Sequence, residues 1–136
     1  MLDLDITQND LGVEGGIALG RMLEINTTLR TLKMRFNRIG FGNERALGFA
    51  KALEANATLT WLDMAQNELG ELGGAAFGEA LKRNRGLTYL DLQRNELGDA
   101  GVSAVAASIA TNATLQTLDV SPVSYTHLTL PTILLV

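Results

Sequence analysis

Hydrophobic residues in this chain follow two periods that alternate along the sequence. Leu32 and Met34 are separated and flanked by polar residues, and this two-residue period predicts a short strand with one buried face. Elsewhere apolar residues recur four positions apart, which is typical of the buried stripe of a helix of about three turns. The four such pairs are Leu19 with Leu23, Phe49 with Leu53, Phe77 with Leu81, and Val105 with Ile109. The pattern therefore predicts short strands that alternate with helices.

The alternation repeats with a nearly fixed period. The motif L-x-x-L-x-L/M-x-x-N occurs four times, and its copies begin at Met1, Leu29, Leu59 and Leu87, with a fifth beginning at Leu115. The asparagines that end the motif recur at steps of 28, 30 and 28 residues, at Asn9, Asn37, Asn67 and Asn95. A second row recurs at steps of 30, 28 and 28 residues, at Asn26, Asn56, Asn84 and Asn112. Two extra residues therefore lie between Asn37 and Asn56, and we expect them in the loop from Phe41 to Arg45.

Each full copy of the motif is followed by a Leu-Gly or Ile-Gly pair, at Leu11-Gly12, Ile39-Gly40, Leu69-Gly70 and Leu97-Gly98. This pattern resembles the leucine-rich-repeat family over Met1 to Ser121, and the 28-residue step is similar to its ribonuclease-inhibitor type, as in NOD-type receptors and Ran GTPase-activating proteins. The resemblance implies an α/β fold: a right-handed solenoid, a horseshoe segment with a parallel sheet on the concave face and helices on the convex face. We expect residues 1–121 to form four repeats and the start of a fifth, as a fragment of a longer solenoid.

The repeat stops at Ser121, and residues 122–136 lack the turn, glycine and helix that should follow. This segment is similar to a translated sequencing adapter, the transposase mosaic end, and we interpret it as a non-native tail. The alternative is a genuine edge strand, Leu128 to Val136, that caps the sheet. The single histidine of the chain, His127, lies in this segment, so we do not propose it as a catalytic base.

Composition narrows the classes of function. A net charge of −4 and a pI near 4.9 disfavour nucleic acid and anionic membranes as partners, because binding to them depends on clustered lysine and arginine. The absence of cysteine excludes disulfides and thiolate metal sites and fits a reducing compartment. No stretch is long enough to span a bilayer, and no secretory signal begins the chain. We therefore expect a cytoplasmic protein.

Residues that could support catalysis are missing from residues 1–121. There is no Ser-His or Cys-His pair, no His/Cys cluster with metal spacing and no Gly-Lys-Ser/Thr to complete a phosphate loop. We expect no enzyme activity, no metal, no cofactor and no small-molecule substrate.

The two asparagine rows have structural interpretations. We predict that the row Asn9, Asn37, Asn67 and Asn95 is a structural ladder, whose buried amides satisfy turn backbone groups in their own and the next repeat. The second row follows each helix, where asparagine serves as a left-handed C-terminal cap. Three members, Asn26, Asn56 and Asn112, also begin glycosylation sequons, so glycosylation is the alternative for them.

The outward-facing strand positions form columns across the repeats. The first column is Asp3, Thr31, Trp61, Tyr89 and Thr117; the second is Asp5, Lys33, Asp63, Asp91 and Asp119; the third is Thr7, Arg35, Ala65, Gln93 and Ser121. Neighbouring strands lie about 4.8 Å apart, so we expect Trp61 and Tyr89 side by side on the concave surface.

Exposed aromatic residues beside charges are typical of protein-binding hot spots. The like charges of Asp63, Asp91 and Asp119 would repel one another, and a basic partner could relieve that repulsion. The alternative is a solvated face, on which Arg94 neutralises part of this charge and Lys33 pairs with Asp5 or Asp63. The predicted partner-binding residues are Trp61, Tyr89, Asp63, Asp91, Asp119, Lys33, Arg35 and Arg94.

The sequence therefore predicts a protein-interaction module that binds a protein partner on its strand surface, and the acidic column favours a basic partner. The resemblance leaves two alternatives: a GTPase-activating regulator like the Ran activators, and the ligand-sensing repeat arm of a NOD-type receptor. Architecture does not decide among them, because members of one fold family share a scaffold and not a partner.

Overall fold

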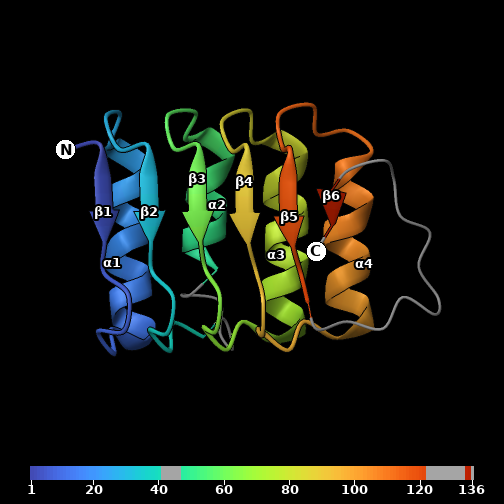
Figure 1. The fold of residues 1–136 in the computed structure, drawn as a ribbon, viewed down its shortest axis with the longest axis horizontal. Coiled ribbons are helices and arrows are strands. Elements are labelled where there is room, and N and C mark those ends of the chain that lie inside the picture. Colours follow the sequence, from blue (N-terminus) through green and yellow to red (C-terminus); the bar gives the residue numbers. More distant parts are fainter. Residues whose placement is uncertain (41–46, 122–133, 136) are drawn as a thin grey trace.

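Strands and helices alternate along the chain (Figure 1). The computed structural model describes residues 1–40, 47–121 and 134–135. Its strands are β1 (Asp3–Asp5), β2 (Thr31–Lys33), β3 (Trp61–Asp63), β4 (Tyr89–Asp91), β5 (Thr117–Asp119) and β6 (Leu134–Leu135). Its helices are α1 (Gly12–Ile25), α2 (Gly48–Ala55), α3 (Gly70–Arg83) and α4 (Gly98–Ile109).

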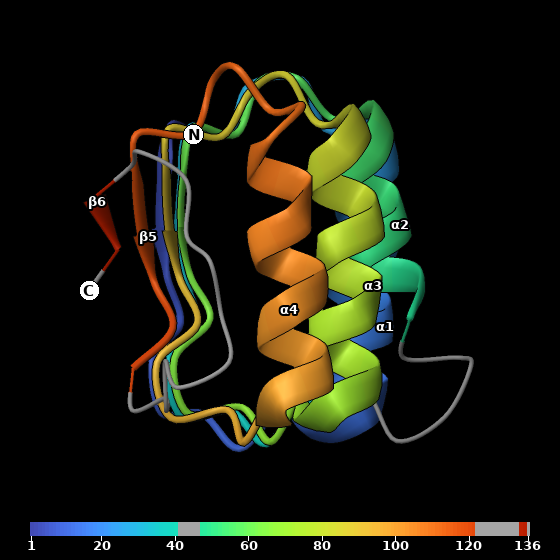
Figure 2. The same cartoon turned by 90° about the vertical axis from the view of Figure 1, so that its right-hand side faces the viewer.

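The strands form one parallel sheet in the order β1-β2-β3-β4-β5-β6. Equivalent motif positions are paired, so that Leu32 lies beside Leu62 and Leu62 beside Leu90. Figure 2 shows the sheet as one layer, on the left, and the helices as a second layer beside it, on the right. Parallel neighbours need a long crossover connection, because a tight turn would make the next strand run in the opposite direction. A helix forms that connection between each pair of neighbouring strands from β1 to β5. The predicted α/β solenoid, with a parallel sheet on one side and helices on the other, is therefore confirmed.

The hydrophobic core lies between the two layers. The strands contribute leucine and methionine from every second position, and the helices contribute the four-residue stripe predicted from the sequence. Phe49, Leu53, Phe77 and Leu81 are fully buried, and burying one such side chain stabilises the fold by about 1.5–3 kcal/mol. Leu19 and Ile109 are only partly buried, because α1 and α4 each have a neighbouring helix on one side alone.

Helices α3 and α4 approach each other closely at glycine. A Cβ built on Gly74 would lie 2.6 Å from the Cα of Gly101, closer than two carbon atoms can pack. We expect Gly74→Ala to lower the free energy of unfolding by about 2 kcal/mol, because the helices must separate. Urea denaturation followed by circular dichroism would measure the loss.

Gly48 is the matched control for that substitution. It is the first residue of α2, and a Cβ built there meets nothing within 4 Å. Gly48→Ala should leave stability unchanged or raise it slightly, because alanine is the better helix former. An equal loss in both variants would contradict the interpretation that Gly74 is required for close helix packing.

Two expectations fall largely outside the described residues. The loop assigned to the two-residue insertion, Phe41 to Arg45, lies outside the described residues. Of the segment 122–136, only Leu134–Leu135 is described, and it pairs with Thr117 and Leu118 of β5 at the edge of the sheet. That pairing matches the edge-strand alternative for these two residues, whereas the interpretation as a non-native tail stays a prediction.

Candidate functional site

The asparagines that end the motif connect neighbouring repeats. The Oδ1 of Asn37 accepts a hydrogen bond from the backbone N of Asn9 at 2.8 Å, and its Nδ2 donates to Ile6 O and Met34 O at 2.9 and 3.0 Å. Asn67 repeats these contacts one unit later. Asn9 is exposed at the end of the solenoid, and its own amide bonds only within its repeat. These hydrogen bonds are those expected of a structural ladder.

The second asparagine row behaves differently from the expectation. Asn26, Asn56 and Asn84 follow their helices with φ of −78°, −74° and −64°, so the prediction of left-handed caps is wrong. Asn112 is not a cap, because α4 is followed by Ala110. The side chains of Asn56, Asn84 and Asn112 instead bridge repeats, whereas Asn26 bonds only within its own. Asn56 Nδ2 donates to Leu23 O at 2.9 Å, while its Oδ1 accepts from Leu59 N at 2.9 Å. With its amide engaged and only 7% exposed, Asn56 is a poor glycosylation acceptor.

Trp61 and Tyr89 stack on the outward face of the sheet. Strands β3 and β4 pair these residues directly, and their ring centroids lie 4.2 Å apart with an interplanar angle of 2°. Both side chains are partly exposed. Lys33 on β2 places its Nζ 5.6 Å from the Trp61 ring centroid, within the range of a cation–π interaction. The expected aromatic neighbours are therefore confirmed as a stacked pair with a cation beside it.

A hollow of about 440 Å³ adjoins this pair over β1 and β2. Trp61 and Lys33 form one side of it, and the exposed carboxylates of Asp3 and Asp5 form the other. Hydrogen bonds from Thr7 lower the pKa of Asp5, so its carboxylate is charged at neutral pH. The sheet face thus combines a flat aromatic surface with accessible negative charge.

The acidic column is buried, which corrects the expectation of an open acidic surface. Asp63, Asp91 and Asp119 are only 7%, 1% and 8% exposed. One oxygen of each accepts a hydrogen bond from the backbone N two residues further on, over 2.9–3.0 Å. The other oxygen is also occupied, because Arg35 bonds to Asp63 and Asp91 while Gln93 donates to Asp119.

Arg35 is the cation that neutralises this column. Its Nε lies 3.1 Å from Asp63 Oδ2 and its Nη2 lies 2.9 Å from Asp91 Oδ2. Burial opposes the charged form of Arg35, but the hydrogen bond and the two carboxylates raise its pKa overall. Burial raises the pKa of Asp91, with Asp63 and Asp119 adding to the effect. Burial likewise raises the pKa of Tyr89.

The other two cations among the predicted partner-binding residues, Lys33 and Arg94, form no ion pair with the acidic column. Lys33 sits over the Trp61 ring, and no ion pair joins it to Asp5 or Asp63 in the structure. Arg94 follows β4 with φ of 52° and lines a separate groove at the turns. The expectation that Arg94 neutralises the acidic column is wrong, because the ion pairs of Asp63 and Asp91 are made by Arg35 and none joins Arg94 to the column.

The described residues contain no group of three His, Cys, Asp or Glu that could hold a metal ion. Within the same ranges no helix is long and apolar enough to cross a lipid bilayer. The chemistry that the face does offer is aromatic and ionic contact.

Comparison with known proteins agrees with this architecture. The family model described as Leucine Rich repeat matches residues 1–20, 26–40, 55–78 and 83–106, more than half of the chain. A solved structure of actin-binding site 2 of leiomodin-1 is similar with a TM-score of 0.76 and 27% identity, covering 87% of this chain and 69% of that one. A search of curated proteins found no match. The chain therefore belongs to the leucine-rich-repeat family.

Proposed function

We propose that this chain is a protein-interaction module whose partner binds the outward face of the sheet, with Trp61 and Tyr89 as its anchors. The stacked, partly exposed aromatic pair is the observation that carries the proposal. Two rings held in contact form a rigid apolar surface, and covering them removes a large area from water at little entropic cost. Full helices of 14, 14 and 12 residues in three repeats support the ribonuclease-inhibitor type of repeat.

The accessible charge on this face favours a basic partner. Asp3 and Asp5 are exposed at the hollow beside Trp61, whereas Asp63, Asp91 and Asp119 are buried and bonded within the fold. The net charge of −4 adds a field that attracts cationic surfaces. We therefore assign the recognition of basic groups to Asp3 and Asp5, and assign Asp63, Asp91 and Asp119 to stabilising the strand ends.

A photo-crosslinking amino acid placed at position 89 should capture the partner directly. The same amino acid at position 72 is the control, because Leu72 is an exposed apolar residue on α3, in the opposite layer. Actin is the first partner to assay, since the similar solved structure carries an actin-binding site. Capture from position 72 and not from position 89 would place the interface on the helices.

For the captured partner we expect Trp61→Ala and Tyr89→Ala each to weaken binding at least about tenfold, because anchors at the centre of an interface dominate its affinity. Isothermal titration calorimetry would measure the change. Leu72→Ala should leave the affinity within about twofold. Unchanged affinity in both aromatic variants would end their assignment as anchors.

The remaining interpretations are proposals with their own tests. Stimulated GTP hydrolysis by any of a panel of small GTPases would support the GTPase-activating alternative, and a nucleotide-binding module in the intact gene would support the receptor arm. Fluorescence microscopy of the tagged protein would test the proposed cytoplasmic location. Resequencing the source gene across codon 121 would test the non-native tail, because a genuine segment 122–136 must be encoded there.

A further inference from the structure

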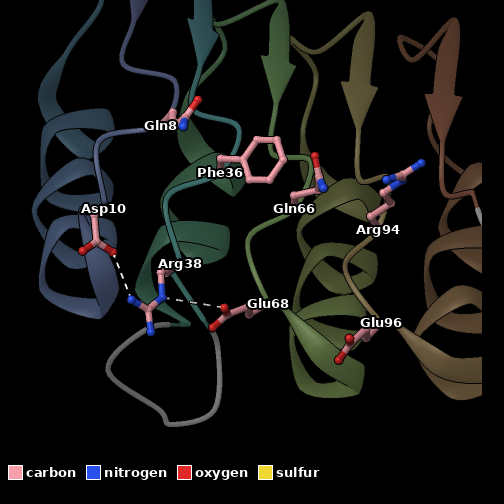
Figure 3. Close-up of a pocket in the computed structure, with 8 residues that line it drawn as sticks. All are labelled: Gln8, Asp10, Phe36, Arg38, Gln66, Glu68, Arg94 and Glu96. Atoms are coloured by element: carbon pink, nitrogen blue, oxygen red, sulfur yellow. Dashed lines mark hydrogen bonds and ion pairs between the residues drawn. The ribbon is translucent and has the colours of Figure 1, made fainter.

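A second groove, separate from the sheet face, runs across the turns that follow the strands. It has a volume of about 660 Å³ and crosses four repeats. One row along it consists of Gln8, Phe36, Gln66 and Arg94, which we call the turn row (Figure 3). All four have positive φ, between 52° and 59°, so each side chain departs from the strand alternation and points outward.

The turn row has the regular spacing of the sheet. The backbone N of Phe36 donates to Ala65 O at 3.1 Å, that of Gln66 to Gln93 O at 2.9 Å, and that of Arg94 to Ser121 O at 2.8 Å. These hydrogen bonds continue the pairing between repeats beyond the strands. Successive members are therefore about 4.8 Å apart, and Phe36 and Arg94 are separated by two steps, or about 9.6 Å.

The stability of the fold gives no reason for a phenylalanine at position 36. It is 46% exposed, and a bulky residue with φ of 59° is strained, whereas the equivalent positions carry glutamine or arginine. The residues on either side of it in the row, Gln8 and Gln66, form no side-chain hydrogen bond with the described part of the chain. An apolar contact surface with a free amide on each side is suited to hold a peptide backbone.

The two arginines of the groove differ in their partners. Arg38 pairs with Asp10 at 3.4 Å and with Glu68 at 3.8 Å (Figure 3). Arg94 forms no ion pair with any described residue, and it is one of the residues that line the open groove. A guanidinium can bind a carboxylate through two parallel hydrogen bonds, so Arg94 is a site for an acidic group.

We propose that the turn row binds a proline-rich segment of a partner protein in the polyproline II conformation, with a proline on Phe36 and a carboxylate three positions away on Arg94. A polyproline II helix rises about 3.1 Å per residue with three residues per turn, so positions three apart share a face about 9.3 Å apart. That distance matches the spacing of about 9.6 Å, whereas same-face positions of a β-strand are about 6.7 or 13.4 Å apart. The carbonyls of polyproline II are free to accept from the glutamine amides.

The test uses three fluorescein-labelled nonapeptides titrated against the full chain by anisotropy. The first is polyproline with a central glutamate, the second has a central lysine, and the third replaces the prolines with serine and threonine around the glutamate. We expect the first to bind at least about tenfold more tightly than either other peptide. Phe36→Ala and Arg94→Ala should each weaken it about tenfold, and Arg94→Glu should reverse the preference to the lysine peptide.

Two controls separate this groove from the rest of the molecule. Arg21→Ala removes an exposed arginine on α1 and should change nothing. Trp61→Ala should also leave peptide binding unchanged, so failure of the sheet-face proposal and failure of this one are distinguishable. No binding of the first peptide at millimolar concentration, equal binding of the lysine or serine-threonine peptide, or unchanged affinity in Arg94→Ala would each overturn the proposal.

Discussion

Replacing Asn67 by alanine is expected to lower the free energy of unfolding by about 3 kcal/mol, because each buried polar group left without a partner costs about 1–3 kcal/mol. Asn67 is fully buried, and its Nδ2 donates to Met34 O at 2.9 Å and Met64 O at 3.0 Å. Its Oδ1 accepts from the backbone N of Asn37 at 3.0 Å, so the substitution also removes the acceptor of that group. Urea denaturation followed by circular dichroism would measure the loss.

Asn9 is the matched control, since it occupies the same motif position at the exposed end of the ladder. Its Nδ2 donates only to Ile6 O and Thr7 O of its own repeat, where water can replace it. Asn9→Ala should therefore cost less than about 1 kcal/mol. Equal losses at both positions would show that burial and bridging between repeats do not account for the role of these amides.

The register of the sheet could be predicted from the sequence because the motif repeats at a fixed position in every unit. A one-residue slip would turn Leu32, Leu62 and Leu90 out of the core, so the hydrophobic pattern alone determines the pairing. The contact between Trp61 and Tyr89 follows from that register. Their stacked orientation does not, because it depends on side-chain rotamers and on Lys33 beside them.

The burial of the acidic column could not be read from strand alternation. Alternation separates inward from outward positions, but it does not reveal that the backbone turns immediately after each aspartate and donates back to its carboxylate. Strand alternation also does not show how far an arginine side chain extends. Arg35, in the third column after β2, extends past β3 to bond to Asp91 on β4. Alternation also fails at Arg94, because a residue with positive φ does not follow the side-chain direction that the strand period predicts.

Replacing Arg35 by alanine is expected to lower the free energy of unfolding by about 3 kcal/mol at neutral pH, because it leaves buried carboxylates without their cation. Asp91 is 1% exposed, and Arg35 Nη2 lies 2.9 Å from its Oδ2. Asp63 loses the same cation, at 3.1 Å from Nε. Like-charge repulsion along the column then lacks the one cation bonded to it, because Lys33, the other cation of the sheet face, lies over the Trp61 ring and forms no ion pair with Asp63.

The pH dependence distinguishes lost charge from lost packing. Burial already raises the pKa of Asp91, so the folded state binds a proton at this carboxylate more readily than the unfolded state does. Protonation of Asp91 therefore stabilises the fold at low pH, and that stabilisation is lost as the pH rises through the raised pKa. The charge of Arg35 lowers the pKa of Asp91, so removing Arg35 raises that pKa further. The deficit of Arg35→Ala should therefore shrink as the pH is lowered from 7. Adding Asp91→Asn to the Arg35→Ala variant should restore most of the stability at pH 7. If the loss of stability does not depend on pH and Asp91→Asn does not reduce it, Arg35 acts through packing of its aliphatic stem.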